Sequence, residues 1–304
     1  MLNFLPSLLI GIIATLLFAL NVLFWPMFVF VLSVLKFLIP LKSVRLFIDR
    51  ILLWLAENWI SCNSGWMRLT QKTKWSVEGL QDLNYKGWYL VSSNHQSWVD
   101  IFVMQHLLNR RIPLLKFFIK RELIWVPVMG IAWWALDFPF LRRYSAEYLR
   151  KHPEQKGKDF DMTRKACEKF KSIPTSVMNF IEGTRFTWAK HKRQKSPYQN
   201  LLRPKAGGLA LAVNVLGEKF DSLLNVTILY PDGIPTFWQF LCGRVKRVVV
   251  RIGRVRVPDD LLHGDYEGDQ IFRTKFQQWV QKLWEEKDIQ IQEMKQEAAL
   301  AARL

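Results

Sequence analysis

His95 and Asp100 stand five positions apart in the run 94–100, and together the two side-chain types can do acid–base chemistry. Histidine has an unperturbed pKa near neutrality, so it can take a proton from a hydroxyl. A carboxylate that accepts the second ring N–H fixes the tautomer and stabilises the imidazolium that forms. A second interpretation stays open, in which Asp100 only caps a helix and His95 is an ordinary loop histidine.

The spacing sets a condition on the elements that hold this pair. Five residues along an α-helix turn through about 500°, which would leave the two side chains about 140° apart. They can meet if His95 lies in the loop after a strand and Asp100 lies in the first turn of the next helix. The run 88–92 is typical of a buried strand. Ser97 and Asp100 have the spacing of a capping box, and this favours Ser97 as an N-cap over Ser97 as a nucleophile.

Three further segments follow the histidine motif along the chain: 120–130, 140–143 and 180–185. With 94–100 they resemble, in order and spacing, the glycerolipid acyltransferase family, specifically the 1-acylglycerol-3-phosphate O-acyltransferases. The bacterial inner-membrane members that are similar to lysocardiolipin acyltransferases look closest. The resemblance runs from about Trp75 to Pro231. The family's second motif usually opens with Gly three residues before the Phe, whereas Asp137 stands there in this chain, and Arg142 and Arg143 compete for the arginine position.

The resemblance implies an α/β fold with a mixed central sheet flanked by helices, preceded by N-terminal membrane helices. It also implies an O-acyltransferase that moves a fatty acyl group from acyl-CoA or acyl carrier protein to lysophosphatidic acid, giving phosphatidic acid in phospholipid biosynthesis. His95 would be the general base, and Asp100 would orient it. The residues expected to bind substrate are Lys120, Arg143, Glu182, Gly183, Thr184, Arg185 and Lys205. No metal and no cofactor besides the thioester co-substrate are expected.

Charge and composition indicate an anionic partner. The 304 residues include 43 Lys and Arg against 26 Asp and Glu, so the formal charge is +17. Such a surplus suits nucleic acid, acidic lipid or a phosphorylated substrate. The basic segment between Glu182 and Glu218 is interleaved with aromatic residues, a texture that also suits single-stranded nucleic acid. The long apolar N-terminus argues against nucleic acid as the partner.

Two alternative functions stay open on these observations. One is the same chemistry on another lysophospholipid, such as lysophosphatidylglycerol or lysocardiolipin. The other is a non-catalytic membrane protein that binds acidic lipid or nucleic acid through its basic surface. The three cysteines are far apart and lack metal-ligand spacing, which is typical of reduced thiols in a cytosol-facing protein.

The first 35 residues carry no charged side chain, and 4–35 is almost wholly apolar. As one helix this run would be about 48 Å long, more than a straight span needs. Pro26 predicts a kink or break. Two interpretations fit: a tilted span that ends near Pro26 with an interfacial helix after it, or a hairpin that dips into the bilayer and returns. Basic residues from Lys36 to Arg50 place that end at the cytoplasmic face, and with the resemblance they indicate a bacterial inner membrane.

The segment 43–59 predicts an amphipathic helix on the membrane surface, with a packed core helix as the alternative. We therefore divide the chain into membrane-anchoring helices over 1–62 and an α/β acyltransferase domain over 63–304 with a C-terminal helix. Alternating short strands and longer helices favour α/β architecture in the second part. The predicted strands are 75–78, 88–92, 114–119, 176–180, 225–230 and 245–252. The predicted helices are 99–108, 162–170, 207–216 and 270–283.

Overall fold

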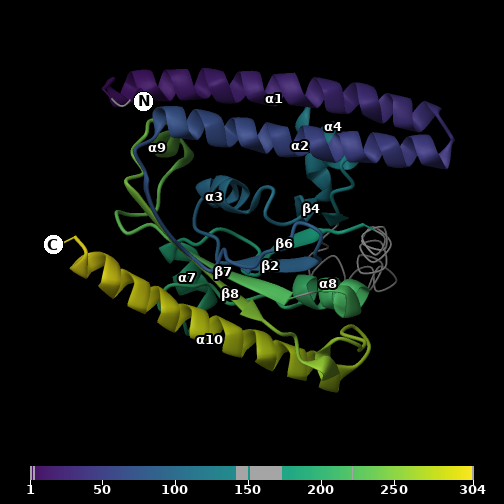
Figure 1. Ribbon diagram of the computed structural model, residues 1–304. Helices are drawn as coiled ribbons and strands as arrows, with labels where there is room; N and C mark the ends of the chain where they lie inside the picture. Colours follow the sequence, from purple (N-terminus) through teal and green to yellow (C-terminus); the bar gives the residue numbers. More distant parts are fainter. Residues whose placement is uncertain (1, 3, 142–149, 151–172, 221, 303–304) are drawn as a thin grey trace.

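A mixed six-stranded sheet forms the centre of the computed structural model, which describes residues 2, 4–141, 150, 173–220 and 222–302 (Figure 1). Its strands follow the order β1-β8-β7-β2-β6-β3, and β7 and β8 are the antiparallel neighbours in an otherwise parallel sheet. The predicted α/β class with a mixed central sheet is confirmed. The strands are β1 (Lys74–Glu78), β2 (Tyr89–Ser93), β3 (Leu115–Phe117), β6 (Ser176–Phe180), β7 (Ser222–Leu229) and β8 (Arg247–Val255).

Most predicted elements are confirmed at or close to their expected bounds. The strand β6 and the helices α3 (Val99–Leu108) and α8 (Gly207–Leu216) match the prediction residue for residue. The expected strand 114–119 is divided, because after β3 the chain leaves the main sheet as β4 (Ile119–Lys120) and pairs with β5 (Phe140–Leu141). The predicted helix 162–170 lies outside the described residues. The last helix, α10 (Gln270–Leu300), continues past residue 283 through a polar segment rich in Glu, Lys and Gln, which are good helix formers.

Helices cover both faces of the sheet (Figure 1). On one face α3 lies under α1 (Ser7–Leu38) and α2 (Lys42–Thr70), and on the other face lie α8 and α10. The strand β2 has parallel partners on both sides, and all of its residues are buried. A strand covered on both faces needs apolar residues in continuous runs rather than in alternation. The two faces of β2 therefore join two hydrophobic clusters, one with α3 and one with α8 and α10.

The helix α1 runs unbroken through Pro26, so both expectations for this run are wrong: it neither ends near that proline nor turns back as a hairpin. Proline removes one main-chain hydrogen bond, and the packing of both halves of the helix holds it together. The helix lies along α2 and also contacts α4 (Met129–Ala135) and α9 (Phe237–Leu241). Between α1 and α2 the buried Asn21 amide donates to Asn63 Oδ1 at 2.8 Å.

The helix α2 is longer than the predicted segment 43–59 and packs on α1 and α3, as in the packed alternative. Residue 62 lies inside α2, so the division of the chain at that residue stays a prediction. Among the described residues, α1 is the helix that is long and apolar enough to cross a membrane, and only 22% of its most apolar window is buried.

Candidate active site

The carboxyl ends of three neighbouring strands bring polar side chains to one edge of the sheet. His95 follows β2, Glu182 follows β6 and Tyr230 follows β7, and β2 runs parallel to both of the other strands. Asp100 reaches the same edge from the first turn of α3. Open α/β sheets bind ligands at this edge, outside the carboxyl ends of their strands. The predicted condition for the histidine and the aspartate is therefore met: a loop after a strand, then the first turn of a helix.

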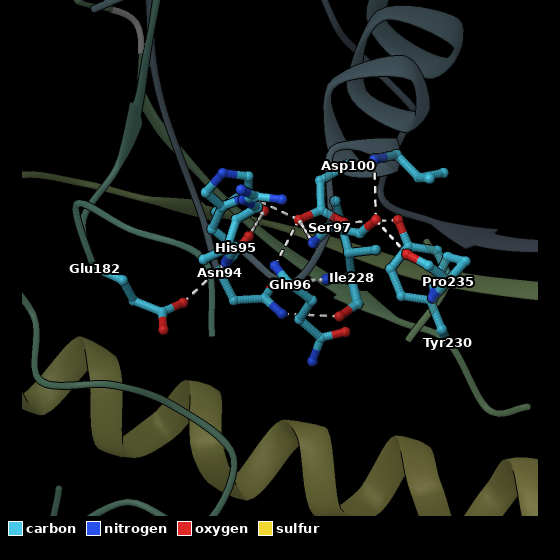
Figure 2. A network of polar contacts seen from close by, with 12 residues as sticks. Asn94, His95, Gln96, Ser97, Asp100, Glu182, Ile228, Tyr230 and Pro235 are labelled. Atoms are coloured by element: carbon cyan, nitrogen blue, oxygen red, sulfur yellow. Dashed lines mark hydrogen bonds and ion pairs between the residues drawn. The ribbon is translucent and has the colours of Figure 1, made fainter. Parts of the chain in front are cut away.

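The His95 ring lies against Asp100, with 2.9 Å between Nδ1 and Oδ2 (Figure 2). The imidazole stacks on the ring of Phe180, with 3.9 Å between centroids and 15° between planes. The His95 side chain keeps 13% of its surface exposed, whereas the Asp100 side chain is fully buried. A carboxylate at Nδ1 favours the tautomer that carries its proton there, so Nε2 is the nitrogen free of a proton.

Asp100 holds both the histidine and the turn that leads into α3, and a single oxygen, Oδ2, makes both sets of contacts. Oδ2 also accepts the main-chain N–H of Gln96 at 2.6 Å and of Ser97 at 2.8 Å. Oδ1 accepts the Tyr230 hydroxyl at 2.6 Å. Burial, with the Asp100 charge beside it, raises the pKa of Tyr230 well above its usual value, so this phenol stays a donor. The two interpretations of Asp100 are therefore not exclusive.

Ser97 has a structural place at the start of α3. Its hydroxyl donates to Pro235 O at 2.6 Å and accepts the main-chain N–H of Val99 at 3.2 Å. The structure begins α3 at Val99 with Trp98 as its N-cap, so the predicted N-cap position of Ser97 is wrong by one residue. The Ser97 hydroxyl proton is nevertheless engaged by Pro235 O (Figure 2).

Glu182 lies behind His95 and is fully buried. Its Oε1 accepts the main-chain N–H of His95 at 2.8 Å, and its Oε2 accepts that of Leu202 at 3.0 Å. The His95 carbonyl in turn accepts the N–H of Phe186 at 2.7 Å, so the main chain of the histidine is held on both sides. Burial raises the pKa of Glu182 to about 8, and the two main-chain donors act against that rise. Its visible contacts position His95, and its role toward substrate stays a prediction.

The residues after Glu182 turn outward to the rim of this edge. Gly183 makes the turn with a φ of +68°, a conformation that favours glycine. Thr184 Oγ1 accepts from Lys190 Nζ at 2.8 Å. The exposed Arg185 guanidinium lies over the Trp98 ring, 4.7 Å from its centroid, so a cation stands directly beside the histidine loop.

The other three expected binding residues are placed as follows. Lys120 is exposed at the end of β4. Lys205 is exposed, and its main-chain N–H donates to Ile181 O at 2.8 Å. Arg143 lies outside the described residues. Binding of substrate by any of the three stays a prediction.

Two residues of this edge were not predicted to have a role. The Asn94 amide donates to Ile228 O and accepts from Ile228 N, both at 2.9 Å, and so ties the histidine loop to β7. Tyr230 supplies the contact to Oδ1 of Asp100 described above. Each is a polar side chain at the end of a predicted strand, and this position is the sequence feature that could have identified it as part of the site. Their partners depend on the pairing of β2 with β7, which the sequence does not specify.

Comparisons with known proteins identify the family. The acyltransferase family model matches residues 74–231, just over half of the chain. The mouse 1-acyl-sn-glycerol-3-phosphate acyltransferase gamma is 26% identical over 243 residues, which are 75% of this chain and 59% of that protein. The chicken lysocardiolipin acyltransferase 1 is 24% identical over 211 residues, 66% of this chain and 52% of that protein. This chain thus spans between half and three fifths of these relatives.

The crystal structure of the 1-acyl-sn-glycerophosphate acyltransferase PlsC from Thermotoga maritima has a similar fold. The TM-score is 0.52 at 20% identity, and the match covers 91% of this chain and 95% of that one. The family match contains the histidine loop, the 180–185 segment and β7 up to its carboxyl end. The chain therefore belongs to the acyltransferase family that includes the 1-acyl-sn-glycerol-3-phosphate acyltransferases.

Proposed function

We propose that this chain transfers a fatty acyl group from a thioester to the free hydroxyl of lysophosphatidic acid and so forms phosphatidic acid. The observation that carries the proposal is the contact between His95 Nδ1 and the buried Asp100 carboxylate at the carboxyl edge of the sheet. It provides a base of suitable tautomer, an orienting charge and a rim open to solvent.

The proposed reaction is a direct transfer. Nε2 of His95 takes the proton from the acceptor hydroxyl while that oxygen attacks the thioester carbonyl carbon. The tetrahedral intermediate collapses, the C–S bond breaks, and the imidazolium returns the proton to the leaving thiolate. Asp100 stabilises the imidazolium throughout. The sequence of steps uses no metal and no cofactor other than the thioester itself, acyl-CoA or acyl carrier protein.

The acceptor phosphate is proposed to bind at the rim beside Trp98. Arg185 is exposed there, and a guanidinium binds phosphate oxygens through two parallel hydrogen bonds. Arg185→Lys keeps the charge and loses this geometry, so the KM for the phosphate-bearing acceptor is expected to rise about tenfold while the KM for the thioester changes little. Saturation curves for each substrate test this, and equal effects on both would remove Arg185 from the acceptor site.

Membrane attachment through α1 and α2 is part of the proposal. The outer face of α1 exposes large apolar side chains, and three leucines, Leu16, Leu20 and Leu23, are each about 60% exposed. Because α2, α4 and α9 flank α1, a perpendicular span would draw the folded domain into the hydrocarbon. We therefore place α1 in the plane of the interface, on the cytoplasmic face of a bacterial inner membrane.

The deciding experiment is an acceptor panel with purified protein in detergent. Lysophosphatidic acid, lysophosphatidylglycerol and lysocardiolipin are each assayed with acyl-CoA and with acyl carrier protein, and His95→Ala is the control. Turnover of lysophosphatidic acid that is lost in His95→Ala is expected. Preference for lysocardiolipin would favour the second candidate, which the similarity to a lysocardiolipin acyltransferase supports. No turnover of any acceptor would refute acyl transfer.

A further inference from the structure

Lys190 closes the rim turn that carries Arg185. It lies in the first turn of α7 (Trp188–Gln194), the short helix that follows the rim turn (Figure 1). Its Nζ donates to Thr184 Oγ1 at 2.8 Å and to the Arg185 carbonyl at 2.9 Å. Its main-chain N–H donates to the hydroxyl of Thr187, the N-cap of α7, at 3.2 Å. The main chain and the side chain of Lys190 therefore both hold residues that precede the helix.

The position of Lys190 in α7 is one that local preferences do not favour for a lysine. Counted from the N-cap Thr187, it stands at the third helical position, where a capping box has Glu or Gln. A helix N-terminus carries partial positive charge, and the first turn of α7 has no acidic residue that would offset a cation there. Residues that oppose a local preference are expected at functional sites. We therefore attribute this lysine to its contacts with the rim turn rather than to the stability of the helix.

The Arg185 carbonyl and the Phe186 N–H belong to one peptide group, and this group is held at both ends. Lys190 Nζ donates to the carbonyl oxygen, and the N–H donates to the His95 carbonyl at 2.7 Å. Because a peptide group is planar, the two contacts together set its orientation. They also set the direction in which the Arg185 side chain leaves the main chain. That side chain ends in the guanidinium that lies over the Trp98 ring.

We propose that Lys190 is a positioning residue: it fixes the peptide group between Arg185 and Phe186, and so holds the Arg185 guanidinium in place for the acceptor phosphate. Two of the three ammonium donors face oxygens of the rim turn, and the Lys190 side chain is half-buried, whereas Arg185 is exposed. Arg185 is thus placed to meet a ligand, and Lys190 is placed to hold Arg185. The kinetic test of this inference rests on the proposed function, and its structural test does not.

The kinetic test compares Lys190→Met with Lys192→Met, which removes the same charge from an exposed position of the same helix. The KM for the phosphate-bearing acceptor is expected to rise about three- to tenfold in Lys190→Met, the scale of a lost hydrogen bond. The KM for the thioester and kcat should change less than about twofold, because Asp100 and Glu182 still hold the histidine. Lys192→Met should follow the parent protein. An equal rise in both KM values, or no rise in either, would overturn the inference.

A double variant separates positioning of Arg185 from direct binding of phosphate by Lys190. Arg185→Ala removes the guanidinium that Lys190 is proposed to hold. If Lys190 acts through Arg185, adding Lys190→Met to Arg185→Ala should raise the acceptor KM by less than about twofold further. If both cations bind the phosphate, the effects of the two single variants multiply, and that result would overturn the positioning role.

Lys190→Gln covers the case in which Lys190→Met does not fold. Glutamine is favoured at this position of a helix, so α7 is expected to form. Its side chain is one bond shorter than that of lysine, so its amide does not reach both oxygens of the rim turn. The acceptor KM should therefore rise as expected for Lys190→Met. A folded Lys190→Gln that keeps the parent value would contradict the inference.

Hydrogen exchange at the Phe186 amide tests the positioning without any turnover, because this amide donates to the His95 carbonyl. It is expected to exchange about tenfold faster or more in Lys190→Met and Lys190→Gln, and at the parent rate in Lys192→Met. Should the parent protein transfer no acyl group while this amide responds, the proposed function fails and the hold of Lys190 on the rim turn stands. A Phe186 amide that exchanges at the parent rate in a folded Lys190 variant would refute the positioning role, whatever the activity.

Discussion

The catalytic edge and the outer face of α1 invert the usual placement of polar and apolar groups. At the edge, the Asp100 and Glu182 side chains are fully buried, whereas Leu16 and Leu20 on α1 are about 60% exposed. Each buried polar group finds its partners inside the chain. The exposed leucines find none there, and a contiguous apolar face of this kind marks an interaction surface.

This difference in the placement of polar and apolar groups shows which contacts stabilise each region. The edge is held by hydrogen bonds from α3, β7, the 182–202 segment and α10, so it should be rigid in the isolated protein. The outer face of α1 depends on a partner outside the chain. A change of charge in the first region should therefore lower kcat. A change of charge on the outer face of α1 should instead lower binding to the membrane.

The largest effect is expected for Asp100→Asn. The amide oxygen can replace Oδ2 toward Gln96 and Ser97, and its NH2 can face the Tyr230 oxygen, so the cap survives. The imidazolium loses its negative partner, and kcat should fall about 10²–10⁴-fold, as for loss of a general base. Steady-state rates and circular dichroism measure the two effects separately.

Tyr230→Phe is the matched control for that variant. It removes one donor to Asp100 and keeps the charge, so kcat should fall only about tenfold, the scale of one hydrogen bond to a charged group. If Asp100→Asn keeps near-full turnover, the carboxylate only caps α3 and the pairing with His95 is not catalytic.

The second largest effect is expected for membrane binding by the outer face of α1. Leu16→Asp with Leu20→Asp should reduce partitioning into anionic vesicles by about 100-fold or more, because each buried leucine contributes about 1.5–3 kcal/mol. Vesicle sedimentation measures the loss, and turnover of a detergent-dispersed acceptor should stay within about twofold. The control pair Ile271→Asp with Ile289→Asp changes two exposed apolar residues of α10, on the opposite side of the sheet. Equal loss for both pairs would mean that no particular face binds the membrane.

The smallest effect is expected for Asp137→Gly, in the loop between α4 and β5. Asp137 has a φ of +56° where the family usually has glycine, and its contact with Lys36 is long at 3.8 Å. Glycine adopts this conformation without the steric cost that a side chain meets, so the free energy of unfolding should rise by up to about 1 kcal/mol with kcat unchanged. In Asp137→Ala the free energy of unfolding should fall by a similar amount. Denaturant unfolding measures both, and a glycine variant less stable than the parent protein would show that the contact with Lys36 matters more than the backbone conformation.

The sequence predicted what depends on neighbours along the chain. The loop-then-helix geometry of His95 and Asp100, the strand β6 and the helices α3 and α8 follow from local patterns, and all were confirmed. Contacts across the fold could not be predicted, because they depend on strand order. Tyr230 meets Asp100 only because β7 lies beside β2. Glu182 faces inward because α10 covers that side.

Pro26 shows the reverse case, in which a local rule gave a wrong expectation. Proline disfavours a helix interior, yet α1 continues through it. The contacts of α1 with α2, α4 and α9 extend over both halves of the helix and outweigh the one lost hydrogen bond. Sequence patterns rank local preferences, and tertiary packing decides when they conflict.

The support that α10 gives to Glu182 also sets an order of events during synthesis. The apolar α1 and its partner α2 precede the sheet in the chain, so they can reach a bilayer while the ribosome is still translating. Trp284 is made after every strand of the sheet, and until its indole N–H reaches Leu202 O, the residue that donates its own N–H to Glu182 lacks this contact. On the proposed function, the nascent protein would therefore reach its lipid before its histidine loop is fully held, and acyl transfer would begin only beside its substrate.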